Sequence, residues 1–189
     1  MNHNRCRWCN LNNPTYVAYH DSEWGVPQHD DRMLFEMLVL ESFQAGLSWE
    51  TILNKRENFR RAFDNFDPIL VKEYDCGKIK SLAEDPGIVR NRRKIEAAIC
   101  NADVFLKIQK EWGTFNAYIW NFTKGETVFE TDLTTSSLSD QISIDLKKHG
   151  MKFVGSTIIY SYLQAIGVIY SHDRTCFLFY DNKQDIPSK

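Results

Sequence analysis

The chain has 189 residues, of which 43% are hydrophobic, and this is enough to bury a core of ordinary size. Its formal net charge of −2 argues against a protein that coats nucleic acid through bulk positive charge. The first residues carry no apolar signal segment, and no stretch approaches the roughly 20 apolar residues of a membrane span. We therefore expect a cytoplasmic protein with no membrane partner, whose cysteines are reduced or metal-bound.

The apolar periodicity predicts one helix after another, with little strand alternation. The first helix begins after Asp30, a good N-cap, and places Leu34, Met37, Leu38 and Glu41 on one face at i, i+3, i+4 and i+7. Further helices are predicted at 50–63, 68–75, 78–84, 92–110, 114–122, 139–149 and 156–166. The Thr-rich residues 121–137 are predicted as a loop. The fold class is therefore all-α, within a single domain over residues 1–189.

Glu41 is the first candidate functional residue, because it stands on the apolar face of its predicted helix. A charged and unpaired carboxylate there costs several kcal/mol, so it must be paired, reach a cleft or serve a function. The alternative is a helix that ends at this point and turns Glu41 to water. The helix is followed by small residues, Gly46 and Trp49, as in loops that carry function.

A second group of candidates is aromatic and lies near the start of the chain. Tyr16, Tyr19, His20 and Trp24 follow each other closely, with Trp8 just upstream. Such a cluster packs in the core of most proteins, and it also suits the stacking of a flat base. Its position beside a candidate metal ligand, His20, favours a rigid binding surface.

Two thiol and imidazole pairs lie at opposite ends of the chain. Cys6 and His20 stand near the start, and His172 and Cys176 stand near the end. Together they make the four-ligand Cys2His2 set that zinc binds. The alternative is four unrelated residues, because the long separation between the pairs matches no zinc-finger spacing.

Residues 146–167 predict two helices around a tight turn. One helix ends at Gly150, the turn carries residues 153–155, and the next helix opens with Ser156. Exposed N–H groups at a helix start suit a DNA phosphate, and an ordinary helical hairpin is the alternative. The basic residues that precede this hairpin in the chain and favour DNA are Arg90, Arg92, Arg93 and Lys94.

Four motifs in this sequence resemble those of the bacterial 3-methyladenine DNA glycosylase I family. They are Tyr-His-Asp-x-Glu-Trp-Gly-Val-Pro from Tyr19, Leu-Glu-x2-Gln-Ala-Gly-Leu-Ser-Trp from Leu40, Gly-Ile-Val-Arg from Gly87 and Lys-Phe-Val-Gly from Lys152. The resemblance covers nearly the whole chain. It implies a helix-hairpin-helix glycosylase fold with two lobes, the hairpin at about 139–167. One structural zinc would join residues 1–30 to 165–189 through Cys6, His20, His172 and Cys176.

The resemblance also implies roles for individual residues. Glu41 and Tyr19 would hydrogen-bond the extruded base as catalytic residues, Trp49 and Trp8 would stack on it, and Tyr16 would line the pocket. The residues expected to touch DNA are Gly46, Leu47, Lys152, Gly155 and Ser156. The implied enzyme is a DNA repair hydrolase, which flips 3-methyladenine out of double-stranded alkylated DNA and releases it. We expect it to be monofunctional, because no lysine stands in an evident nucleophile motif, and a monomer is the simplest expectation.

Three other functions compete with this interpretation. Catalytic zinc hydrolysis needs an open coordination position, which a complete Cys2His2 set does not leave. A Cys176 nucleophile activated by His172 would be a free thiolate rather than a zinc ligand. A non-catalytic module that binds damaged or single-stranded nucleic acid through its aromatic residues would bind DNA without releasing a base.

Overall fold

The structure is a computed structural model, and it describes residues 3–180 of the chain. It is mostly helical, as predicted. In chain order the elements are α1 (Pro14–Ser22), α2 (Asp31–Gln44), α3 (Trp49–Asn54), α4 (Arg56–Ala62), the 3-10 helix η1 (Asp64–Phe66), α5 (Pro68–Val71), α6 (Cys76–Glu84), α7 (Arg92–Trp112), α8 (Phe115–Asn121), β1 (Val128–Phe129), α9 (Ser137–Lys148), α10 (Ser156–Ala165) and β2 (Ile169–Tyr170). None of the helices within residues 3–180 is long and apolar enough to cross a membrane.

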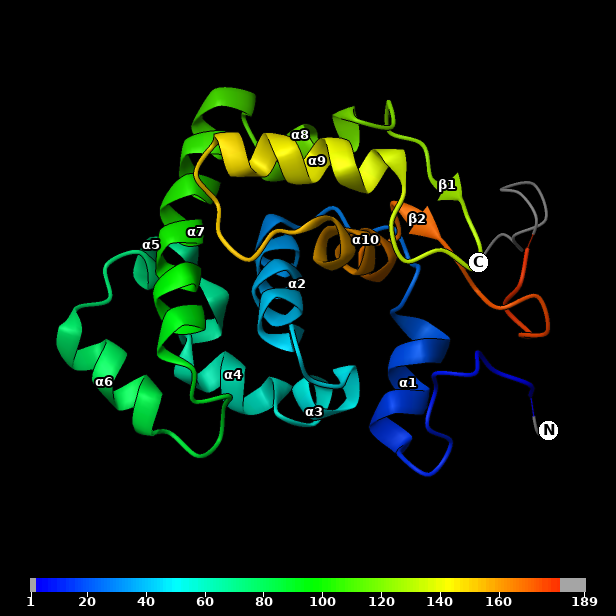
Figure 1. Cartoon of the computed structure of the whole chain (residues 1–189), viewed down its shortest axis with the longest axis horizontal. Coiled ribbons are helices and arrows are strands. Elements are labelled where there is room, and N and C mark those ends of the chain that lie inside the picture. The colour runs from blue at the N-terminus through cyan, green and yellow to red at the C-terminus, as the bar shows by residue number, and fades with distance from the viewer. Residues whose placement is uncertain (1–2, 181–189) are drawn as a thin grey trace.

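Helix α2 is the centre of the fold. Every residue from Leu34 to Phe43 is buried, and the helix packs against both α7 and α10. Figure 1 shows α2 in the middle of the molecule, with the long α7 beside it and α9 across one end. Because α2 is enclosed on all sides, any polar residue on it must find a partner or face a cavity.

Helix α1 is absent from the sequence-based prediction. It begins after Asn13, whose side chain accepts hydrogen bonds from the backbone N–H groups of Thr15 and Tyr16, and Pro14 occupies the first turn. The helix brings Tyr16, Tyr19 and His20 onto one buried face at i, i+3 and i+4. The aromatic cluster and a candidate metal ligand are thus held by one element.

Three predicted elements are corrected by the structure. The helix expected at 68–75 ends at Val71, as α5. The single helix expected at 50–63 is divided at Lys55, whose ψ of 0° ends α3 and starts α4. The loop expected at 121–137 contains β1, which pairs in parallel with β2, Val128 opposite Ile169 and Phe129 opposite Tyr170. Two-residue strands are too short to give a visible alternation in the sequence.

Gly167, just after α10, allows two chain segments to approach very closely. Its φ is +73°, and a Cβ atom there would lie 2.4 Å from the backbone nitrogen of Pro27. Next to this contact, the N–H groups of Gly25 and Gln28 donate to the carbonyls of Gln164 and Ile166. The segment between α1 and α2 is therefore fixed against the end of α10.

The first and last described segments also lie together, on the side of the molecule where α1 and β2 are found (Figure 1). The side-chain amide of Asn4 donates to the carbonyl of Thr175 at 2.7 Å, and the backbone carbonyl of Asn4 accepts from the N–H of Phe177 at 2.8 Å. The segments 1–30 and 165–189 named in the sequence analysis meet here, although residues 1–2 and 181–189 lie outside the described part of the chain.

Candidate active site

A cavity of about 180 Å³ opens between α1, α2, α3 and α10. It is much smaller than the roughly 300–1,000 Å³ of pockets for drug-sized ligands, so its size suits one small flat ring system. Five residues that the sequence nominates for base binding line it together: Trp8, Tyr16, Tyr19, Glu41 and Trp49.

The walls of the cavity are aromatic. The rings of Tyr19 and Trp49 are 5.4 Å apart between centroids, and those of Trp8 and Tyr16 are also 5.4 Å apart. Trp24 packs edge-on against Trp8 at 4.8 Å. Such faces bind flat and cationic rings well, because their π-electrons are negative.

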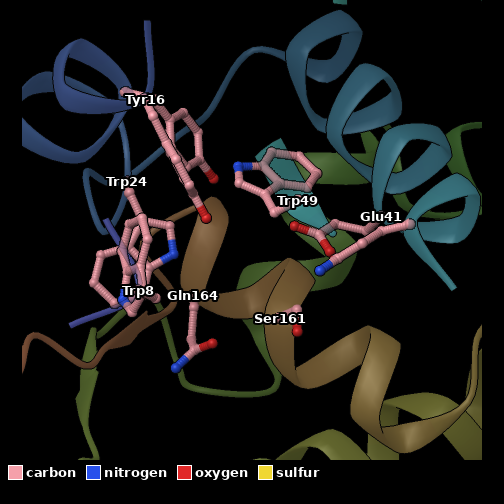
Figure 2. A pocket seen from close by; sticks show the side chains of 9 residues that line it. Trp8, Tyr16, Trp24, Glu41, Trp49, Ser161 and Gln164 are labelled. Atoms are coloured by element: carbon pink, nitrogen blue, oxygen red, sulfur yellow. The ribbon is translucent and has the colours of Figure 1, made fainter. Parts of the chain in front are cut away.

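Glu41 reaches the cavity from α2, and its carboxylate points toward the ring of Trp49 (Figure 2). It is 4% exposed, and its Oε2 atom has no hydrogen-bond partner. Burial raises the pKa of Glu41 to about 8, because water no longer solvates the charged form. The indole Nε1 of Trp49 is also buried without a partner. The cavity thus offers unsatisfied polar atoms to a ligand.

Trp24, from the aromatic cluster that the sequence nominates, also lines the cavity, together with three residues that are not nominated in the sequence analysis: Gln44, Ser161 and Gln164. Figure 2 shows Ser161 and Gln164 on α10, on the side opposite Trp49. Their spacing of three residues places them on the same helix face, within an otherwise apolar segment. Neither residue is nominated from the sequence, because only the packing of α10 beside the cavity distinguishes them from surface residues.

The four nominated metal ligands come together at one buried point. The ligand atoms of Cys6, His20, His172 and Cys176 all lie within 4.8 Å of one another. Nδ1 of His172 is 3.4 Å from Sγ of Cys6 and 3.6 Å from Sγ of Cys176, and Nε2 of His20 is 3.5 Å from Sγ of Cys176. A tetrahedral zinc with bonds of about 2.3 Å to sulfur and 2.0–2.1 Å to nitrogen has sulfur–nitrogen edges of about 3.5 Å.

The surroundings of the cluster suit metal ligands. Backbone N–H groups of Asp173 and Leu178 point at the sulfurs of Cys6 and Cys176, at 3.3 and 3.4 Å. Burial lowers the pKa of His172 to about 3, so its imidazole is neutral, as a ligand must be.

The second histidine is oriented by a neighbouring carboxylate. Nδ1 of His20 lies 2.8 Å from Oδ1 of Asp21, and that carboxylate also accepts from the guanidinium of Arg5. A carboxylate behind a histidine fixes the orientation of the ring and leaves its other nitrogen free to bind a metal.

The cluster also contacts the wall of the cavity. The ring of Trp8 is 5.2 Å from that of His20, and Trp24 lies 4.7 Å from His172, edge to face. Tyr19 precedes His20 on α1. The four-residue cluster thus packs against the aromatic side of the cavity, and none of its residues lines the cavity.

The residues nominated for DNA contact lie in two turns outside the cavity. Gly46, with a φ of +79°, and Leu47, which is 43% exposed, form the turn after α2. Lys152, Gly155 and Ser156 lie in the hairpin between α9 and α10, where Lys152 is exposed. A hydrogen bond of 3.2 Å from the hydroxyl of Ser42, near the end of α2, to the carbonyl of Phe153 links α2 to the hairpin.

These features together define a class of protein. It is a helical protein with a small aromatic pocket, a buried unpaired carboxyl group and a separate metal-type cluster that stabilises the pocket wall. A profile of the methyladenine glycosylase family matches residues 8–179. The chain belongs to that family.

Individual relatives agree with this assignment. The chain is 44% identical over 186 residues to DNA-3-methyladenine glycosylase 1 of Escherichia coli, covering 95% of this chain and 98% of the relative. A crystal structure of 3-methyladenine DNA glycosylase I superposes with a TM-score of 0.89 at 42% identity, covering 93% and 99% of the two chains. The Staphylococcus aureus enzyme, in a structure that addresses its recognition of 3-methyladenine, gives 0.87 at 36% identity, covering 92% and 95%.

Proposed function

We propose that this DNA-3-methyladenine glycosylase extrudes 3-methyladenine from double-stranded alkylated DNA into the cavity and hydrolyses its glycosidic bond. The observation that carries the proposal is the unpaired Glu41 carboxyl group at the edge of an aromatic cavity sized for one base. Enzymes that act on a base must take it out of the stack and recognise it by edge hydrogen bonds and stacking.

Each pocket residue has a role in this proposal. Glu41 accepts a hydrogen bond from the amino edge of the adenine, and the hydroxyl of Tyr19 fixes its orientation. Trp49 and Trp8 stack on the base, and Tyr16 closes the side. Glu41 is 4% exposed and has an unpaired oxygen. This supports the role, because a ligand that donates a hydrogen bond to a buried unpaired atom gains binding free energy.

The charge of the substrate favours the ionised form of Glu41. Methylation at N3 places a positive charge on the base in the nucleotide, and a cation beside a carboxyl group lowers the pKa of that group. The pKa of about 8 in the free enzyme therefore falls when the lesion enters, and a proton leaves Glu41. An undamaged neutral adenine gives no such compensation for the buried charge.

The bond cleavage then needs little from the protein. The bond between C1′ and N9 breaks, and its electron pair neutralises the cationic base, which leaves as neutral 3-methyladenine. A water oxygen bonds to C1′, and its proton is released to solvent. The pocket contributes mainly by selecting and positioning the lesion. No lysine is assigned as a nucleophile, so the enzyme is monofunctional.

The two exposed turns bind the duplex in this proposal. Gly46 and Leu47 fill the gap left by the extruded base, and the exposed side chain of Leu47 supports this role. Lys152, Gly155 and Ser156 hold a phosphate at the start of α10 in a helix-hairpin-helix arrangement.

Cys6, His20, His172 and Cys176 would hold one structural zinc, which we call the zinc clamp. The sulfur–nitrogen distances of 3.4–3.6 Å support the fit. Bound to all four ligands, the ion would cross-link the two ends of the chain. It would have no open coordination position for a reaction. We propose further that the chain is one two-lobed domain, acts as a monomer and works in the bacterial cytoplasm, where its DNA lies.

The experiment that tests the assignment of the pocket compares wild type with Glu41→Gln and Tyr19→Phe on alkylated duplex DNA. Both variants are expected to release 3-methyladenine at least about tenfold more slowly, because each loses a hydrogen bond to the base. Release by both at the wild-type rate would show that these residues do not recognise the lesion.

A further inference from the structure

We propose that Lys94 and Asn101, two buried polar residues of α7, are positioning residues that hold the two DNA-contacting turns in a fixed relation to each other. The turns are residues 45–48 after α2, and the hairpin at 152–156. The inference rests on the proposed function, because it explains how the protein shapes the surface that would receive the duplex.

Asn101 fixes the hairpin. It is completely buried, its Nδ2 donates to the carbonyl of Lys152 at 2.9 Å, and its Oδ1 accepts from the N–H of the same residue at 2.8 Å. An amide that pairs with both backbone groups of one residue sets its orientation as well as its position. The exposed side chain of Lys152 is therefore presented from a rigid backbone.

The hairpin needs this support because its conformation is unfavourable. Phe153 has a φ of +54°, in the left-handed region that residues with a Cβ rarely adopt. Its carbonyl accepts from Ser42 of α2, and the carbonyl of Val154 accepts from Ser143 of α9 at 2.6 Å. Side chains from three helices thus hold the hairpin in place, and α10 then begins at Ser156, where the N-cap residue Gly155 has no side chain to cap the helix.

Lys94 fixes the other turn. The residue is 6% exposed, and its ammonium donates to the carbonyls of Phe43 at 2.8 Å and Ala45 at 2.6 Å. These carbonyls lie at the C-terminal end of α2, where a positive charge is favourable. Lys94 therefore lies in the interior. This corrects the sequence-based prediction, which placed it among the basic residues that favour DNA. The turn through Gly46 and Leu47 begins at this anchor.

One rigid element connects the two anchors. Lys94 and Asn101 are seven residues apart on the 21-residue helix α7, so they share a face at a separation of about 10.5 Å along its axis. The hydroxyl of Ser42, near the end of α2, lies 3.2 Å from the Phe153 carbonyl and 2.8 Å from the Leu38 carbonyl, so its one proton is shared between α2 and the hairpin. Because α7 does not bend easily, it sets the distance between the segment that enters the duplex and the segment that holds a phosphate.

The test uses Asn101→Leu, which keeps the volume and removes both hydrogen bonds, and Lys94→Met. The matched control is Gln109→Leu, on the same helix, which removes a 2.6 Å hydrogen bond to Asp31 away from both turns. For each protein we would measure the Kd for free 3-methyladenine by tryptophan fluorescence, and the Kd for a duplex with a tetrahydrofuran abasic site by anisotropy. KM and kcat for base release complete the comparison.

We expect Kd for the duplex and KM to rise about tenfold or more in both variants, because each leaves backbone groups unpaired in a turn that meets DNA. Kd for the free base should stay within about twofold of wild type, as should every value of the control. Ser143→Ala, which removes a single hydroxyl, replaces any variant that does not fold and is expected to change the same constants in the same direction.

Two results would overturn the inference. Unchanged duplex affinity in folded variants would mean that the anchors do not shape the DNA surface. A parallel loss of affinity for the free base and the duplex would mean that the residues only stabilise the fold. The proposed function fails by a different result, absence of 3-methyladenine release by wild type, so the two failures are distinguishable.

Discussion

Replacing Glu41 by Gln should stabilise the protein relative to wild type by an amount that grows as the pH rises. The same substitution removes the group that would recognise the base. The carboxyl group is 4% exposed and has an unpaired oxygen, and burial raises its pKa from 4.5 to about 8. The folded protein therefore keeps a proton that the unfolded chain releases above about pH 4.5. The stability from this group is complete below the unfolded pKa and is lost as the pH rises through the folded pKa.

The size of the effect follows from the two pKa values. Each unit of difference corresponds to about 1.4 kcal/mol, so wild type loses about 2.5 kcal/mol relative to Glu41→Gln between pH 5 and pH 7. Above pH 8 the difference levels off, after a total of about 5 kcal/mol. The glutamine has nearly the same shape and no charge, so its own contribution does not change over this range.

The assay is urea unfolding of both proteins at pH 5, 6, 7 and 8, followed by circular dichroism. The free energy of unfolding of the variant minus that of wild type should grow with pH at about 1.4 kcal/mol per unit in the middle of the range. A difference that stays constant from pH 5 to pH 8 would mean that Glu41 is ionised in the free protein. The account of a ligand-dependent charge in the pocket would then be wrong.

Three further predictions follow from the same structure. The value of kcat/KM on alkylated DNA should rise with pH, with its midpoint near the pKa of about 8 for free Glu41 and a plateau above it, and a flat profile from pH 6 to 9 would contradict the ionised form as the active one. Cys176→Ser should lower zinc content from one ion per chain and reduce Tm by about 10 °C or more, as measured by elemental analysis and calorimetry; full stability without zinc would refute the zinc clamp. Gly167→Ala should destabilise the fold by about 3 kcal/mol or more, since its Cβ would overlap the backbone of Pro27. The control Gly113→Ala, at a φ of +84° with nothing within 4 Å, should cost only about 1 kcal/mol in the same unfolding assay.

The sequence predicted the elements whose pattern is long and regular. The spacing from Leu34 to Glu41 was sufficient to place a carboxyl group on the buried face of α2, and the structure has it there. Helix α1 was missed because it has only nine residues and a weak apolar face, so the cap formed by Asn13 and Pro14 was its only clear signal.

The remaining features depend on tertiary contacts that a single sequence does not encode locally. Ser161 and Gln164 look like ordinary surface residues until α10 is packed beside the cavity. Lys94 follows the polar run 90–93, and its sequence context places it among basic residues that favour DNA, yet it is buried against the end of α2, 51 residues away from Phe43 in sequence. Composition cannot separate a lysine that meets DNA from one that caps a helix.

The central claim is tested most directly by incubating the wild-type protein with methylated duplex DNA and identifying the released bases by chromatography. The account predicts release of 3-methyladenine with little 7-methylguanine, because Glu41 in the cavity would accept a hydrogen bond from the amino group of adenine, and guanine has a carbonyl oxygen at that position. Binding to the duplex without release of any base would contradict it and support a non-catalytic recognition module. Equal release of 7-methylguanine would contradict the selectivity assigned to the pocket.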